Sequence, residues 1–308
     1  MRRAALCYAA SMTTTLAPLP QQATWQRNLA AFGYRQMLPM LALAPYVQHY
    51  WELALPAGQP SSHSELLHPD GGSSLLFQLA GELNINGVRA QQGVLFSPTA
   101  AHSGQLSLAA GVSVFAVRFR PGMGAAFWRC AASEFAGEVL GLEGAPYLRF
   151  DLPAVTEQLQ LAPDMPSRVA LFDTALCGAL AGGADIASVL PQTLALLRAA
   201  RGQQPLTQVL AQTGLGQRQL ERLFNRYLGL TAKQFSRLHR VAYSRELLKH
   251  AHPDPLAEVA YVAGYSDQAH FSHDFKSVVG LTPGQYLRRV RARYHNAEHT
   301  DAAIVHRA

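Results

Sequence analysis

The C-terminal third of this 308-residue chain contains one pattern twice. The first copy begins at Pro205 and reaches Gly214, and the second begins at Pro255 and reaches Gly264, 50 positions later. Beyond these glycines the matched positions lie 51 apart: Leu220 with Phe271, Phe224 with Phe275, Gly229 with Gly280, Leu230 with Leu281, Thr231 with Thr282, and Phe235 with Tyr286. Such a repeat indicates one supersecondary unit present twice, and it constrains the fold more than any other feature.

Each copy has the signals for two helices and a turn between them. In the second copy, Asp254 and Pro255 suit the start of a helix, and Ser266 suits the cap of the next one. Glycine suits the helix ends, because it enters the left-handed region without steric cost. Apolar residues follow at helical spacing: Val259, Val262 and Ala263 in the first helix, and Phe271, Phe275, Val278 and Val279 in the second. This order predicts two helix-turn-helix motifs.

The segment between the copies, residues 231–250, predicts a connecting helix. It opens with Thr231-Ala-Lys-Gln234, a capping box, and a second capping box stands at Thr282-Pro-Gly-Gln285. Twenty helical residues span about 30 Å at ~1.5 Å per residue. Successive major grooves on one face of DNA recur at about 34 Å. A rigid connecting helix would therefore place two recognition helices in neighbouring grooves.

The charge of the chain is concentrated on the repeat. Residues 1–185 hold 10 Arg against 12 Asp and Glu, a net −2, whereas residues 186–290 hold 13 Lys and Arg against 6 Asp and Glu, a net +7. A basic excess confined to one domain is the electrostatic footprint of a polyanionic partner. Together with the two motifs, it favours double-stranded DNA as that partner.

Four stretches of the repeat carry a family resemblance: Gln219-Leu-Glu-Arg-Leu-Phe224, Gly229-Leu-Thr231, Gly264-Tyr-Ser-Asp-Gln-Ala-His-Phe-Ser272 and Gly280-Leu-Thr-Pro-Gly-Gln-Tyr286. Residues 186–290 resemble the DNA-binding domain of the AraC/XylS family of bacterial transcription regulators. The resemblance implies a cytoplasmic regulator that binds promoter or operator DNA. Two positions depart from the family pattern: His273 stands where Arg is common, and Leu210 where a small residue is usual.

The second helix of each motif is expected to enter the major groove and to read base edges near its N-terminus. The candidate DNA-contact residues are Arg218, Glu221, Arg222 and Asn225 in the first copy, and Gln268, Ala269, His270, Ser272, His273 and Lys276 in the second. Arg can pair with guanine, and Asn or Gln with adenine. For His270, packing and hydrogen bonding within the domain is the alternative. The candidate phosphate contacts are Lys233, Arg237, Arg288 and Arg289, joined by Arg240 and Arg245.

The N-terminal part predicts β structure over residues 46–120, where short apolar runs are separated by Gly and Pro. Asn86-Gly87 between Leu83–Ile85 and Val88–Ala90 indicates a hairpin with a type I′ turn. Residues 123–143 and 153–183 are expected to be helical, with a hinge near Gly182, Gly183 and Asp185. The predicted fold is α+β, with a β-rich, cupin-like barrel or sandwich and an all-α C-terminal domain.

These patterns divide the chain into four regions. Residues 1–150 form a β-rich sensor domain, which also resembles the domains found ahead of such modules at Pro69-Asp-Gly71 and Phe119-Arg-Pro-Gly122. Residues 151–185 are connecting helices that could dimerise, residues 186–290 bind DNA, and residues 291–308 are a flexible tail. The first residues of the chain, Arg2-Arg3 followed by Ala4–Ala10, form a weak signal-peptide pattern that Ser11 interrupts. A frayed N-terminus, or a true start at Met12, explains this segment better.

The composition disfavours an enzyme. His49, His63, His68 and His102 suggest a metal-binding cupin, but they contain no His-x-His pair, so we expect neither metal nor cofactor. Cys7, Cys130 and Cys177 lie far apart and in no context that activates a thiol, which argues against a disulfide framework, a zinc site and a DNA-repair alkyl acceptor. No apolar run approaches the ~20 residues of a membrane span, so we expect no membrane partner.

The role of the β-rich domain stays open on sequence alone. It could bind a small-molecule effector, with Arg118 or His102 at the mouth of a cavity, or serve only as a protein-interaction or dimerisation module. The aromatic residues could line such a cavity or form plain core: Trp51, Phe77, Phe96, Phe115, Phe119 and Trp128. A homodimer and a contact with RNA polymerase are further partner expectations. The identity of an effector, the operator sequence and the choice between activation and repression are not predicted.

Overall fold

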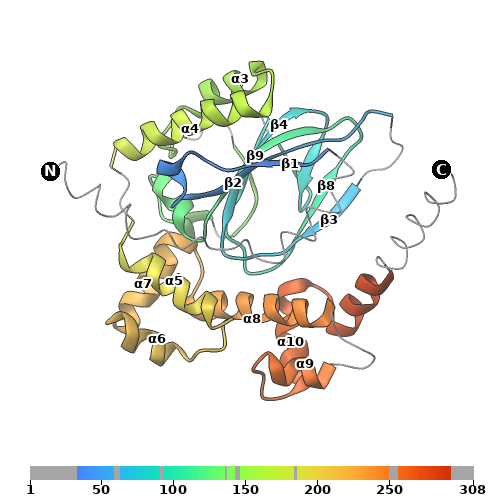
Figure 1. Ribbon diagram of the computed structural model, residues 1–308, viewed down its shortest axis with the longest axis vertical. Helices are drawn as coiled ribbons and strands as arrows, with labels where there is room; N and C mark the ends of the chain where they lie inside the picture. Colours follow the sequence, from blue (N-terminus) through green and yellow to red (C-terminus); the bar gives the residue numbers. More distant parts are fainter. Residues whose placement is uncertain are drawn as a thin grey trace.

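The computed structural model describes residues 33–292, except for 59–62, 91–92, 136, 143–145, 184–185 and 250–255. The expectations for the N-terminal start, Cys7, Asp185, the Asp254–Pro255 helix start and residues 293–308 of the tail therefore lie outside the described residues. Figure 1 shows a β-rich domain with two helices on one side of it and a helical domain on the other. The α+β prediction is confirmed.

The β-rich domain consists of two antiparallel sheets. The larger has the order β1 (Arg35–Met37), β2 (Val47–Ala54), β9 (Ser113–Phe119), β4 (Ser73–Ala80), β7 (Val94–Ser97) and β10 (Leu140–Gly141). The smaller has the order β3 (His63–Leu67), β8 (Gly104–Leu108), β5 (Leu83–Ile85) and β6 (Val88–Arg89). The β5–β6 hairpin turns at Asn86 and Gly87, both with positive φ (55° and 82°), as the type I′ prediction requires.

Alternation along β9 divides the apolar residues between two cores. Val114 and Ala116 belong to a cluster shared with the smaller sheet. Phe115 and Phe119 belong to a second cluster, which is covered by α3 (Leu152–Leu161) and α4 (Met165–Ala181). All six aromatic residues that could have lined a cavity are buried in these clusters, Trp51 in the first and Phe77, Phe96, Phe115, Phe119 and Trp128 in the second. The core alternative is thus confirmed for these side chains, although Trp128 also borders a pocket at the boundary with the helical domain.

The helical expectation for residues 123–143 is wrong in kind. The segment forms two 3-10 helices, η2 (Met123–Phe127) and η3 (Ala132–Phe135), and then strand β10, where Leu140 pairs with Phe96. The reason is that the backbone here pairs with a distant segment: Trp128 forms a bridge with Leu148, and Arg129 N donates to the Tyr147 carbonyl at 2.7 Å. Residues 153–183 are helical as expected, but they form two helices, and the Asp164 carboxylate caps the second by accepting a hydrogen bond from Ser167 N at 2.9 Å.

The C-terminal domain has the predicted repeat. After α5 (Val189–Ala199), the first copy comprises α6 (Leu206–Thr213) and α7 (Gln217–Leu228), and the second comprises α9 (Leu256–Val262) and α10 (Gln268–Val279). The four repeat glycines, Gly214, Gly229, Gly264 and Gly280, all have positive φ, between 68° and 82°. One correction concerns the cap of α10, which is Asp267 rather than Ser266, since Asp267 Oδ1 accepts from His270 N at 2.7 Å.

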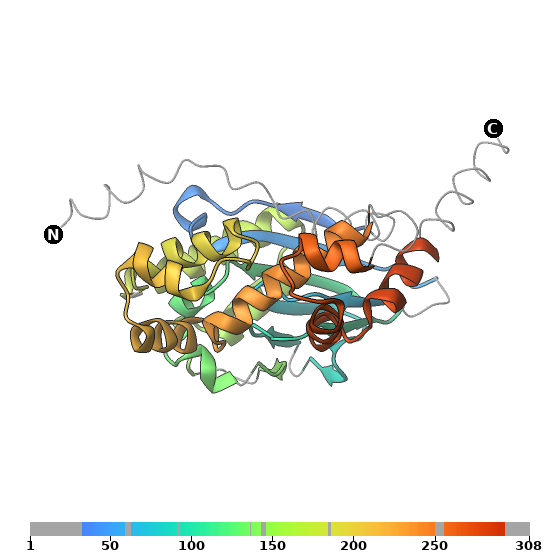
Figure 2. The same ribbon diagram turned by 90° about the horizontal axis from the view of Figure 1, so that it is seen from below.

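The connecting helix is α8 (Ala232–Lys249), and both capping boxes form as predicted. Thr231 Oγ1 accepts from Gln234 N at 3.1 Å, and Gln234 Oε1 accepts from Thr231 N at 2.8 Å. The equivalent pair, Thr282 and Gln285, opens a helical segment at residues 283–292. Figure 2, seen from the helical side, shows α8 crossing in front of the β-rich domain, with the first motif on one side of it and the second on the other.

The two domains share apolar packing. Met123 of η2 is buried in the core of the helical domain, together with Leu190, Leu194 and Leu228. Gly122, just before η2, lies so close to this core that a Cβ there would approach Leu190 and Leu228 to 3.2 Å. The β-rich domain therefore packs directly against the helical domain.

Candidate DNA-binding interface

Helix α7 separates its buried and exposed residues as a recognition helix requires. Leu220, Phe224, Tyr227 and Leu228 are buried against the helical core. The remaining face carries the predicted base-reading residues, and all of them are exposed: Arg218, Glu221, Arg222 and Asn225. Arg226, which the sequence analysis passed over, is exposed too. Its position four residues after Arg222 was the available signal, because residues four apart share a helix face.

Helix α10 presents a matching face. Its buried residues are Phe271, Asp274, Phe275, Val278 and Val279. Among the predicted contacts, Gln268, Ala269, His270, His273 and Lys276 are exposed and Ser272 is half-buried. The N-terminus of the helix is held by Asp267, whose pKa lies below its ordinary value because the His270 N–H and the Ser266 hydroxyl donate to the carboxylate. These residues are placed where DNA could reach them.

His270 has partners inside the domain, as its alternative role predicts. Its Nε2 lies 3.6 Å from Asp274 Oδ2, and its ring packs edge-on against Tyr265 at 5.2 Å between centroids. Asp274 also lies 3.9 Å from Arg237 Nη1 in α8. His270 therefore belongs to a small polar network at the junction of α10 and α8, although its side chain remains exposed.

The candidate phosphate contacts differ in their surroundings. Lys233, Arg288 and Arg289 are exposed, and Arg237 is half-buried near Asp274. The expectation for Arg245 is wrong, because this side chain is only 6% exposed and lies against Tyr286. Arg240 is also engaged, since its Nε and Nη2 donate to the Gly202 carbonyl at 3.2 and 2.8 Å. Both positions face the domain core because α8 is buried on more than one side.

The β-rich domain contacts both recognition helices. At the end of α7, Gly229 lies so close to η3 that a Cβ there would approach the Ala132 carbonyl oxygen to 2.9 Å. At the end of α10, the Val278 carbonyl accepts from the Ser103 backbone N–H at 2.7 Å and from the Ser103 hydroxyl at 2.9 Å. The Ser103 hydroxyl also hydrogen-bonds His68 Nδ1 at 2.7 Å. One domain thus touches both candidate DNA-reading elements.

A buried polar cluster lies where α8 covers the β-rich domain. Asp70 and Arg118 form an ion pair, and Asp70 Oδ1 also accepts from Gly72 N at 2.8 Å, which stabilises the turn at Gly71 and Gly72. Burial alone would raise the pKa of the Asp70 carboxyl, but the Arg118 charge and the Gly72 N–H lower it below its usual value. His49 from β2 and His239 from α8 are buried nearby, and burial lowers the pKa of each to about 4. Arg118, expected at a cavity mouth, is thus paired at the domain boundary.

Within the described residues, no group of three or more His, Cys, Asp and Glu side chains is arranged to hold a metal ion. Cys130 and Cys177 are free thiols, and burial raises the pKa of both. None of the helices in the described ranges is long and apolar enough to cross a membrane.

Comparison with known families divides the chain in the same way. Residues 209–289 match a family described as a helix-turn-helix domain, and residues 35–141 match a domain of unknown function, DUF6597. Among curated proteins, the HTH-type transcriptional regulator GlxA of Rhizobium meliloti (strain 1021) is 38% identical over 76 residues, 25% of this chain and 23% of that protein. The HTH-type transcriptional activator RhaR of Klebsiella pneumoniae is 31% identical over 81 residues, 26% of this chain and 28% of that protein. The similarity therefore spans about a quarter of each relative.

Solved structures with related arrangements include ToxT from Vibrio cholerae, with a TM-score of 0.40 and 10% identity over 74% of this chain and 97% of that one. A probable AraC family transcriptional regulator from Rhodopseudomonas palustris has a TM-score of 0.31 and 24% identity, and covers 34% of this chain and 98% of its own. The residues of the family match, 209–289, contain both helix pairs, α6 with α7 and α9 with α10. Residues 209–289 thus carry a helix-turn-helix domain, and the chain is similar over about a quarter of its length to curated transcriptional regulators.

Proposed function

We propose that this chain is a sequence-specific DNA-binding transcription regulator. One observation supports the proposal above all others: two exposed polar helix faces, on α7 and α10, stand on either side of the single helix α8. The 18 residues of α8 span about 27 Å at ~1.5 Å each. This length suits two neighbouring major grooves on one side of a duplex. The protein is further proposed to act on DNA in the cytoplasm and to have no enzymatic activity.

We propose that α7 and α10 contact the bases and that the flanking basic residues contact phosphates. Arg218, Arg222 and Gln268 are proposed as the main base-reading residues, because Arg suits guanine and Gln suits adenine. Lys233, Arg288 and Arg289 are exposed and are proposed to fix register on the backbone. His270 is proposed to organise the domain through Asp274 rather than to read a base.

The β-rich domain is proposed to be the part that responds to an effector. Its contacts with the ends of both α7 and α10 give it a direct mechanical connection to the DNA-reading elements. A domain that served only protein interaction would need no such contacts with both motifs. Leu38 and Leu41 are 75% and 89% exposed, and this apolar surface near η1 (Leu41–Leu43) supports an additional role in homodimerisation. Light scattering of the wild type and of a Leu38→Ser, Leu41→Ser variant would test the dimer.

Selection of duplexes from a randomised library with the full chain tests the DNA-binding function. We expect an enriched motif with two half-sites about one helical turn apart. Arg218→Ala and Arg222→Ala should each relax the preference within one half-site. Arg89→Ala is the control, because Arg89 is an exposed arginine on the β-rich domain. Recovery of random sequences by the wild type would overturn the proposal.

A further inference from the structure

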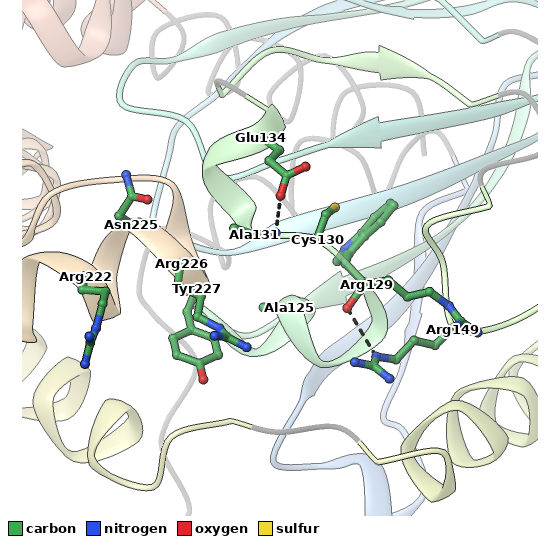
Figure 3. A pocket seen from close by; sticks show the side chains of 11 residues that line it. Ala125, Arg129, Cys130, Ala131, Glu134, Arg149, Arg222, Asn225, Arg226 and Tyr227 are labelled. Carbon is green, nitrogen blue, oxygen red and sulfur yellow. Dashed lines mark hydrogen bonds between the residues drawn. The ribbon is translucent and has the colours of Figure 1, made fainter.

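A pocket of about 410 Å³ lies between the recognition helix α7 and the β-rich domain. In Figure 3, Arg222 and Arg226 extend from α7 on one side, and Arg129 and Arg149 lie on the other. The volume falls within the range of about 300–1,000 Å³ that is typical of small-molecule sites. The pocket is therefore large enough for a small organic ligand, and its walls come from both domains.

The charge of the pocket is strongly unbalanced. Its walls contain four arginines and one carboxylate, that of Glu134, and the Glu134 Oε1 already accepts from the Ala131 backbone N–H at 2.9 Å. Among the residues that the structure describes, none of the four arginines has a carboxylate within ion-pairing distance. Several guanidinium groups around one pocket create a positive potential that attracts anions. The pocket thus selects for negative charge.

The two arginines of the β-rich domain are held in place by the backbone. Trp128 and Leu148 form an antiparallel bridge, so Arg129 and Arg149 project from the same side of the paired segments. Arg129 Nε donates to the Leu148 carbonyl at 3.4 Å, and Arg149 Nε donates to the Trp128 carbonyl at 3.3 Å. These bonds use the Nε groups and leave the terminal Nη groups for a ligand. Paired Nη donors match the geometry of carboxylate and phosphate groups.

The pocket also has an aromatic part, formed by Trp128 and Tyr227, which are 4% and 7% exposed. Because both side chains are almost fully buried, a ligand would meet only their edges, and its charged groups would contact the arginines. A bare inorganic ion would leave most of the volume empty. The lining therefore suits an organic molecule with two or more anionic groups.

We propose that this pocket binds a small, multiply charged organic anion, and that the anion competes with DNA for Arg222 and Asn225. Both residues line the pocket, and both belong to the face of α7 that is assigned to base reading. The Arg222 guanidinium cannot hydrogen-bond a pocket ligand and a guanine edge at the same time. Each ligand should therefore lower the affinity of the protein for the other. The competition rests on the proposed DNA-binding function; the anion site itself does not.

The test uses the full chain and a variant that changes only the β-rich side, Arg129→Gln with Arg149→Gln. Citrate and fructose 1,6-bisphosphate serve as the carboxylate and phosphate probes, and each is titrated by calorimetry at constant ionic strength without DNA. We expect at least one probe to bind the wild type and to lose at least tenfold in affinity for the double variant. Arg89→Gln is the matched control and should bind as the wild type does. Thermal melts verify that each variant is folded.

DNA binding is then measured with the selected duplex. The bound probe should lower the affinity of the wild type for DNA and leave the double variant unaffected, while both proteins bind DNA equally without the probe. The anion site is refuted if neither probe binds the wild type. It is also refuted if the double variant loses affinity for DNA without any probe, because Arg129 and Arg149 would then be phosphate contacts. Probe binding without selective DNA recognition would instead refute the proposed function and leave the anion site standing.

Discussion

Ser103 of the β-rich domain donates two hydrogen bonds to the carbonyl oxygen of Val278, one from its backbone N–H at 2.7 Å and one from its hydroxyl at 2.9 Å. Val278 lies in the last turn of α10, where backbone carbonyls have no partner within the helix. Ser103 therefore acts as a cap supplied by another domain. The position of the second recognition helix is tied in this way to the β-rich domain.

Ser103→Ala should weaken this connection, because it removes the hydroxyl and keeps the backbone bond. A typical hydrogen bond of this kind contributes about 1 kcal/mol. We expect faster amide hydrogen exchange in the C-terminal half of α10 and a loss of about 1 kcal/mol in the free energy of unfolding. Ser107→Ala is the control, because Ser107 is a half-buried serine on strand β8, which begins directly after Ser103; it should leave exchange in α10 unchanged.

Arg222→Ala should reduce affinity for the selected duplex by about 1–3 kcal/mol and relax base preference at one position. The reason is the loss of a bidentate donor on the exposed face of α7. Competition binding against duplexes with single base changes measures both effects. If affinity and preference both stay at wild-type values, Arg222 does not read a base.

Lys276→Ala should act differently, since Lys276 lies in the last turn of α10, away from the N-terminal residues proposed to read bases, and a lysine there suits phosphate. We expect weaker binding to all duplexes alike and a decrease of about 1 in the slope of log affinity against log salt. Binding isotherms at several salt concentrations provide the slope. A sequence-dependent loss would instead assign Lys276 to base reading.

Gly202→Ala should destabilise the helical domain by more than about 2 kcal/mol. Gly202 has a φ of 69°, and a Cβ there would lie 1.9 Å from the Ser236 carbonyl oxygen in α8, so both backbone strain and a clash oppose it. Gly178→Ala is the opposite case, because Gly178 lies in α4 with nothing within 4 Å of a Cβ, and we expect it to stabilise by about 0.5–1 kcal/mol. Denaturant titrations should give opposite signs; equal signs would contradict the geometry.

Stability should fall as the pH is lowered through the titration range of two buried histidines. Burial lowers the pKa of His49 and His239 to about 4, whereas in the unfolded chain each has an ordinary pKa of about 6.5. Between these values the unfolded state binds more protons, so stability is greatest above about pH 6.5 and is lost toward pH 4, on the order of 3 kcal/mol per histidine.

Charged neighbours modify both histidines. The Asp70 carboxylate raises both pKa values, while Arg118 and Arg120 lower that of His49 and Arg198 lowers that of His239. Urea titrations at pH 7, 6 and 5 should therefore show falling midpoints for the wild type and a shallower fall for His239→Gln. An identical pH dependence of the two proteins would show that His239 does not titrate on unfolding.

Local signals explain why the helical half could be predicted closely. Gly229 and Gly280 mark helix ends through their backbone geometry alone, and the Thr231–Gln234 box needs only four residues. The one local error, Ser266 in place of Asp267, arose because both residue types cap helices and stand side by side. Pattern alone cannot choose between adjacent caps.

The domain contacts could not be predicted, because they join residues far apart in sequence. The Ser103–Val278 pair is separated by 175 positions. Arg129 and Arg149 face the same way because of the Trp128–Leu148 bridge, and Trp128 lies in residues 123–143, which were expected to be helical. Likewise, Arg245 looked like a surface base until the packing of α8 against Tyr286 enclosed it. Tertiary packing, not local propensity, decides these positions.

Met123, which belongs to the β-rich domain yet lies in the core of the helical one, has a consequence for how the protein melts. Neither half can lose its structure without exposing apolar side chains of the other, so heating should produce a single calorimetric endotherm rather than two. Severing the chain between the halves would bare Leu190 and Leu228 to water, and the separated C-terminal piece should be prone to aggregate.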